Sequence, residues 1–145
     1  MKQRSRIIFF YFIAILMLSE MITSNLYSLV GPLEDTAEFM GITVAAERIR
    51  LVILIVLDAI PGVGAVLAIR AYRHSVTVGT GRIGVLTSTL GMLAYGGYQL
   101  WSAMFLLGNR QSFVTLVGVV YATLGLVTWL VGSDLRQVTK NSFRD

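Results

Sequence analysis

The chain contains no cysteine and only one histidine. Without cysteine there can be no disulfide, no thiolate-bound metal and no cysteine nucleophile. The one histidine, His74, lies between Arg73 and Ser75 in a short basic segment, where a solvated side chain is the usual outcome. A single histidine also supplies too few ligands for a zinc or haem centre. We therefore expect no cofactor and no metal site, and we assign no catalytic residue.

Charge is scarce as well. Asp, Glu, Lys and Arg make up 14% of the 145 residues and hydrophobic residues make up 55%, whereas charged residues approach a quarter of a soluble domain. The apolar residues form long blocks, which is typical of a membrane protein. Four blocks are long enough to cross a hydrocarbon core of roughly 30 Å, which takes about 20 helical residues. They lie at about 7–30, 51–72, 83–107 and 113–132.

These blocks predict an all-α fold, an integral membrane four-helix bundle with multiple passes through the cell membrane. The composition is uniform and lacks Pro/Ser-rich linkers, so we expect one domain over residues 1–145. The last two spans are joined by a short connection and should form an antiparallel hairpin. Residues 133–145 form a short polar tail. Within the connection at 31–50, the stretch "LEDTAEFM" could form a short helix whose acids, near its start, suit the helix dipole. Residues 43–50 could equally be an extension of the second span outside the membrane.

The basic residues predict the orientation, because Lys and Arg near span ends stay on the cytoplasmic side. Nine of the twelve fall on one side of the predicted spans. We therefore expect cytoplasmic N and C termini and an acidic outer loop at 31–50. This topology already explains the net charge of +4, so no nucleic-acid partner is expected. The nine are Lys2, Arg4, Arg6, Arg70, Arg73, Arg82, Arg136, Lys140 and Arg144, and the outer group is Glu34, Asp35, Glu38, Glu47 and Arg48.

The basic start and the apolar run after it also fit the first two regions of a signal peptide. No A-x-A cleavage site follows the run, however. We therefore expect this segment to remain in the protein as its first span.

Two carboxylates fall inside the predicted spans, Glu20 in the first and Asp58 in the second. Ionisable groups at membrane depth are costly, and they usually face a protein interior or a water-filled cavity. The two spans run in opposite directions, and at about 1.5 Å per residue both carboxyls come within a turn of the same height. If the helices are neighbours, the pair could share one proton or one cation. Alternatively, each carboxyl contacts a neighbouring helix or a second subunit.

Further polar residues lie outward of Glu20. Ser24 follows it by one turn and therefore shares its face, and Tyr95 and Gln99 lie one turn apart on the third span. We infer a cavity that opens outward and ends near Glu20, Asp58 and Tyr95. The alternative is that these side chains only hydrogen-bond between helices. With helical spacing, the face of Glu20 also carries Thr23, Tyr27 and Ser28.

Pro61, one of two prolines, adds a backbone feature beside Asp58. It cannot donate a hydrogen bond to the carbonyl of Leu57, so the helix should kink or loosen there. Small residues elsewhere in the spans mark points where helix backbones can touch, either within the bundle or between protomers. These are Gly64 with Ala68, and Gly118 with Ala122.

The segment "AILMLSEMITSNL", residues 14–26, resembles the first helix of the small multidrug resistance transporters. The resemblance implies a membrane-embedded glutamate that exchanges protons for cationic drugs, and Glu20 is the matching position. It covers one helix only. The outer loop is larger here than in that family, and the aromatic partners on its later helices are not clearly present.

The segment "ERIRLVILIVLDAIP", residues 47–61, is similar to the second-helix region of the eicosanoid and glutathione membrane enzymes. That family is also four-helical, and the similarity implies an enzyme acting on a lipophilic substrate. Ile55 replaces the expected asparagine, and the arginine-bearing motif of the third helix is missing. The shared residues are Glu47, Arg48, Asp58 and Pro61.

Three functions from different classes remain open. The first is a non-catalytic accessory or assembly subunit of a larger membrane complex, with other membrane subunits or further copies of itself as partners in the lipid bilayer. It is favoured by the missing cofactor ligands and catalytic constellation. The second is a small proton-coupled or cation transporter that uses Glu20 and Asp58. The third is a membrane enzyme in which Asp58 performs acid–base work on a lipophilic substrate.

Overall fold

The computed structural model describes residues 3–106 and 109–137, which form helices and short connections without a strand. The N-terminal rod is continuous from Gln3 to Val30 and changes its helix type on the way. It consists of α1 (Gln3–Glu20), the π-helix η1 (Met21–Leu26) and α2 (Tyr27–Val30). The helices that follow are α3 (Leu33–Met40), α4 (Val44–Tyr72), α5 (Val78–Ala103), α6 (Asn109–Val131) and α7 (Ser133–Gln137).

Three helical segments are long and apolar enough to cross a membrane, namely Gln3–Val30, Val44–Tyr72 and Arg110–Val131. They indicate a membrane protein, as the composition predicts. Helix α5 has 26 residues and is therefore long enough as well. Glycine, serine, threonine, tyrosine and glutamine recur along it and lower its hydropathy below that of the three.

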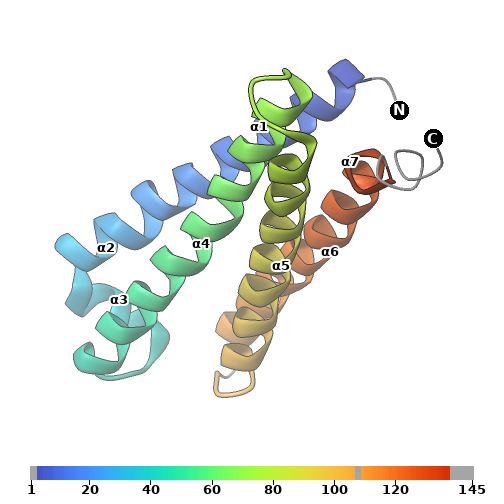
Figure 1. Ribbon diagram of the computed structural model, residues 1–145. Coiled ribbons are helices and arrows are strands. Elements are labelled where there is room, and N and C mark those ends of the chain that lie inside the picture. The colour runs from blue at the N-terminus through green and yellow to red at the C-terminus, as the bar shows by residue number, and fades with distance from the viewer. Residues whose placement is uncertain (1–2, 107–108, 138–145) are drawn as a thin grey trace, which may run out of the picture.

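The long helices pack in chain order, with α1 on α4, α4 on α5 and α5 on α6 (Figure 1). Phe10, Ile13 and Met17 of α1 are fully buried, and Val85 and Met92 of α5 are fully buried as well. In lipid, such helices associate through close packing and interhelical hydrogen bonds, because the acyl chains are as apolar as leucine. The closeness of this packing and the hydrogen bonds between the helices therefore determine the stability of the bundle.

Glycines allow α4 and α5 to approach with their backbones. A Cβ atom on Gly64 would lie 2.5 Å from the amide nitrogen of Ser88, and one on Gly84 would lie 2.6 Å from the carbonyl oxygen of Gly64. The contact between α5 and α6 is built in the same way, with Gly96 against the backbone of Gly118 and Ala122. The small residues predicted as contact points thus lie between helices of this chain.

At one end of the bundle, α7 packs against α5 and α6, and its Asp134 reaches the start of α1 and the end of α4. Arg6 forms an ion pair with Asp134, and the hydroxyl of Tyr72 donates a 2.6 Å hydrogen bond to the same carboxylate. Arg82 donates a 2.6 Å hydrogen bond to the carbonyl of Leu135. The start of α1 and the last described helix therefore lie at the same end of the bundle (Figure 1).

At the other end, α3 lies close to α2 and the start of α4 (Figure 1). It coincides with "LEDTAEFM", which confirms the short helix predicted there, and it ends at Gly41 in the left-handed conformation with φ 70°. The hydroxyl of Thr43 then caps α4 by accepting a hydrogen bond from the amide of Ala46. Residues 44–50 form the first turns of α4, which agrees with the extension of the second span that the sequence left open for residues 43–50.

Candidate functional site

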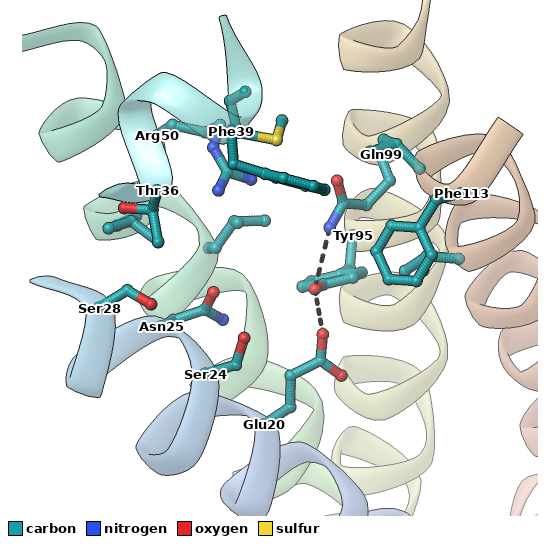
Figure 2. Close-up of a pocket in the computed structure, with 15 residues that line it drawn as sticks. Glu20, Ser24, Asn25, Ser28, Thr36, Phe39, Arg50, Tyr95, Gln99 and Phe113 are labelled. Atoms are coloured by element: carbon teal, nitrogen blue, oxygen red, sulfur yellow. Dashed lines mark hydrogen bonds between the residues drawn. The ribbon is translucent and has the colours of Figure 1, made fainter. Parts of the chain in front are cut away.

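A cavity of about 220 Å³ lies near the α3 end of the bundle (Figure 2). Residues from the N-terminal rod and from α6 both line it, so the row of packed helices curves around this space. Its apolar wall consists of Phe39, Met40, Leu51, Leu54, Phe113, Val114 and Val117. Its polar wall consists of Glu20, Ser24, Asn25, Ser28, Thr36, Arg50, Tyr95 and Gln99.

Glu20, Tyr95 and Gln99 form a hydrogen-bonded chain across the cavity wall (Figure 2). The hydroxyl of Tyr95 donates a 2.5 Å bond to Oε1 of Glu20. Nε2 of Gln99 donates a 3.0 Å bond to the same hydroxyl. Oε1 of Gln99 is buried and has no hydrogen-bond partner among the described residues. The structure therefore brings together three of the five residues predicted for the polar site, and Ser24 lines the same cavity.

Asp58, the fifth, lies behind the cavity wall. It is fully buried, and its Oδ2 accepts a 2.5 Å hydrogen bond from the side-chain amide of Asn25. Its Oδ1 has no hydrogen-bond partner in the described part of the chain. Asp58 and Glu20 lie close enough to interact electrostatically. The two carboxyls predicted as a pair have different surroundings, because Glu20 lines the cavity and Asp58 is bound to Asn25.

The π-helix explains why Asn25 points inward. In an α-helix the residue five positions after Glu20 lies on a different face, whereas a π-helix has i→i+5 hydrogen bonds and brings such residues closer to one face. Asn25 is accordingly 3% exposed. Unbroken α-helical spacing past Glu20 does not predict Asn25 as a buried residue. Single π-turns inside helices are frequent at functional sites.

The same change of helix type divides the residues that α-helical spacing placed on the face of Glu20. Ser24 and Ser28 line the cavity as predicted. Thr23 and Tyr27 are exposed instead, and the hydroxyl of Thr23 donates to the carbonyl of Ser19 within its own helix.

Arg50 is a second residue of the cavity that the sequence did not reveal. Its Nε and Nη2 donate hydrogen bonds of 2.6 and 2.7 Å to the two carboxylate oxygens of Glu47. Glu47, predicted in the outer loop, is fully buried on α4, because this bidentate pair satisfies its charge. The spacing of three residues along one helix was the available signal. With Arg50 neutralised in this way, Glu20 is the uncompensated ionisable group of the cavity wall.

The rest of the predicted outer group lies on the surface. Glu34, Asp35, Glu38 and Arg48 are exposed. Glu34, Asp35 and Arg48 line a separate depression beside Gly31. The structure therefore does not bring these four residues to the cavity.

Pro61 lies inside α4, which continues as one helix from Val44 to Tyr72. The proline is buried, and a Cβ atom on Gly91 of α5 would lie 2.7 Å from its Cδ. The predicted loosening of the helix would occur at the carbonyl of Leu57, because Pro61 has no N–H group to donate a hydrogen bond to it. Pro61 thus contributes a close contact with α5 one turn from Asp58.

Within residues 3–106 and 109–137, no group of three His, Cys, Asp or Glu side chains is arranged to hold a metal ion. No family model, curated protein or solved structure matches the chain. The geometry of the cavity is therefore the basis for assigning a function.

Proposed function

We propose that this protein is a small multi-pass transporter of the cell membrane that binds a small organic cation at Glu20. The observation that carries the proposal is an uncompensated carboxyl group in the wall of a cavity between apolar helices. A carboxylate in such surroundings requires a neutralising proton or cation. Exchange of one for the other at Glu20 would couple cation movement to proton movement.

The charges around the cavity favour a cation over an anion. Arg50 is bound by both oxygens of Glu47, so its charge is neutralised locally. Asp58 adds a second acidic group behind Asn25. An anionic ligand would meet Glu20 without a free positive partner in the described cavity wall.

The apolar part of the wall favours an organic cation. Tyr95 and Phe113 line the cavity (Figure 2), and aromatic rings attract cations through their negative faces. The ring of Phe39, also in the wall, already holds the guanidinium group of Arg110 at 5.5 Å. The volume of about 220 Å³ suits a small molecule. A neighbouring apolar cavity of about 370 Å³ also has Met40 and Arg50 in its wall, which supports a substrate with an apolar part.

A four-span topology is part of this proposal. Helix α5 packs along α4 and α6 (Figure 1), both of which are apolar enough to cross a membrane, so it would share their hydrocarbon environment. Its polar residues would then face neighbouring helices, and Tyr95 and Gln99 are buried there. Most of the basic residues that the structure describes lie at the end where α1 begins, so the positive-inside rule gives cytoplasmic termini. The cavity then lies toward the outside.

The two other functions have less support. A subunit that docks through small residues needs them on its surface, whereas Gly64, Gly84 and Gly96 contact helices of this chain. An enzyme that uses Asp58 needs this residue to reach a substrate, whereas Asp58 lies behind Asn25.

The test is equilibrium binding of benzyltrimethylammonium, a small aromatic cation, to the purified protein in nanodiscs. We expect saturable binding accompanied by proton release into a weakly buffered solution. Glu20→Gln preserves the size of the side chain and its capacity to accept from Tyr95, and it should abolish both signals. Glu34→Gln removes an exposed acid outside the cavity and is the matched control.

Equal binding by the wild type and Glu20→Gln would refute the role of Glu20. A fixed set of other membrane proteins that co-purifies with the chain, together with no cation binding, would favour the accessory subunit instead.

A further inference from the structure

We infer that the groove between α1 and α4, at the end where α1 begins, binds an anionic phospholipid. This inference does not depend on cation binding at Glu20, since the groove lies at the opposite end of α4. The groove has a volume of about 430 Å³. It is apolar along its length and basic at its mouth, as a lipid site requires.

The apolar part arises from small and branched side chains on the two helices. Ala14 and Ile69 form its floor and are each 5% exposed. Ile15 and Val66 line it and remain 63% and 41% exposed. Because Ala14 carries only a methyl group, α1 and α4 leave a furrow between them. From Arg73 to Val66 it extends about 10 Å along α4 at 1.5 Å per residue, which accommodates the upper part of an acyl chain.

The mouth carries the guanidinium groups of Arg70 and Arg73. Both side chains are exposed, and neither forms an ion pair with a described residue. The only described acid at this end, Asp134, already binds Arg6 and Tyr72. Two uncompensated positive charges therefore remain beside the furrow.

Arg73 is held in place by an aromatic ring. Its guanidinium carbon lies 5.3 Å from the ring centroid of Tyr11 on α1, a distance at which a cation and an aromatic ring attract each other. Ser75 adds a hydroxyl at the same mouth. Arg73 therefore bridges the two helices that form the furrow and directs positive charge at its opening.

This combination selects a phospholipid with a net negative headgroup. Guanidinium groups bind phosphate oxygens in a bidentate manner, and basic pockets between membrane helices bind acidic headgroups. A soluble phosphate compound would leave the apolar furrow empty. A zwitterionic lipid would fill the furrow but would not match two unpaired arginines.

The experiment is native mass spectrometry of the purified full chain titrated with phosphatidylglycerol or phosphatidylcholine. Each basic residue contributes roughly a fivefold factor toward an anionic headgroup. Arg70→Gln with Arg73→Gln should therefore lower the affinity for phosphatidylglycerol about 30-fold and leave that for phosphatidylcholine unchanged. Arg4→Gln with Arg48→Gln removes the same charge from exposed positions outside the groove and should change either affinity less than threefold.

A second variant tests the furrow without altering charge. Val66→Trp should fill the furrow and weaken binding of both lipids. The isolated headgroup, glycerophosphoglycerol, should not compete with the intact lipid. The inference is overturned if the two pairs of arginine variants behave alike, if Val66→Trp has no effect, or if the headgroup competes as well as the lipid.

Discussion

The side-chain amide of Asn25 donates a 2.5 Å hydrogen bond to Oδ2 of Asp58, and this bond joins the π-helix to α4. Asn25 is 3% exposed and Asp58 is fully buried. Because Oδ1 of Asp58 has no partner in the described chain, Asn25 is its main source of stabilisation among the residues described. This bond therefore adds a polar contact at the π-helix to the apolar packing of α1 on α4.

Replacing Asn25 by leucine should lower the free energy of unfolding by about 2–3 kcal/mol, because a buried carboxyl group loses its hydrogen-bond donor. The measurement is thermal or denaturant unfolding in detergent, followed by circular dichroism. Thr23→Val is the control, because Thr23 is exposed and bonds only within its own helix, and it should change stability by less than about 0.5 kcal/mol. Equal stability of the two variants would show that the bond to Asp58 contributes nothing.

Gly64→Ala should destabilise the bundle by about 1–3 kcal/mol, the usual cost of overpacking. The new methyl group would lie 2.5 Å from the backbone of Ser88, so α4 and α5 would have to separate. Gly97→Ala on α5 is the control, because a Cβ atom there meets nothing within 4 Å. It should leave stability unchanged or raise it by up to about 1 kcal/mol through helix propensity. A loss of stability in Gly97→Ala as large as that in Gly64→Ala would contradict the assigned contact.

Asp134→Ala should detach α7 from the bundle, because it removes the partner of both Arg6 and Tyr72. We expect faster hydrogen exchange across residues 133–137 and a loss of about 1–3 kcal/mol in stability. Asp35→Ala removes an exposed acid from α3 and should leave exchange in α7 unchanged. If α7 stays protected in Asp134→Ala, the packing of Leu135 rather than the carboxylate holds it in place.

The absence of cysteine makes topology directly measurable, because a single introduced cysteine is the only thiol. In intact cells, a membrane-impermeant maleimide should label Ala45→Cys and Gln111→Cys. Ser75→Cys should react only after the membrane is permeabilised. Ser75 and Gln111 flank α5, so labelling on opposite sides would establish that α5 crosses the membrane. If Ser75→Cys and Gln111→Cys are labelled from the same side, α5 does not cross the membrane and the protein has three spans.

Composition and apolar blocks were sufficient to predict an all-helical membrane protein, because the cost of exposing polar backbone in lipid leaves few alternatives. Because ionisable groups are costly at membrane depth, Glu20 and Asp58 could also be predicted as site residues. Tyr95 and Gln99 followed from helical spacing, and the structure joins them to Glu20.

Asn25 and Arg50 could not be predicted as cavity residues for separate reasons. The inward position of Asn25 depends on the change from α-helix to π-helix at Met21. No periodic pattern in the sequence predicts this change. Arg50 reaches the cavity only because α4 begins at Val44, whereas the sequence left a loop and an extension of the second span equally open for this stretch. Glu47 and Arg50 neutralise each other, so this stretch can be helical and buried.

The π-helix at Met21–Leu26 also changes how the N-terminal rod presents its side chains. One additional residue in a helix rotates everything beyond it by about 100° relative to an unbroken helix. Residues before Glu20 and residues after Leu26 therefore belong to two different helical wheels on one continuous rod. A scan of substitutions along this rod should show a periodic pattern of tolerated positions that shifts by one residue at the π-helix. The side chains that face α4 near the start of the rod and those that face the cavity near its end therefore follow two helical wheels, which are offset from each other at the π-helix.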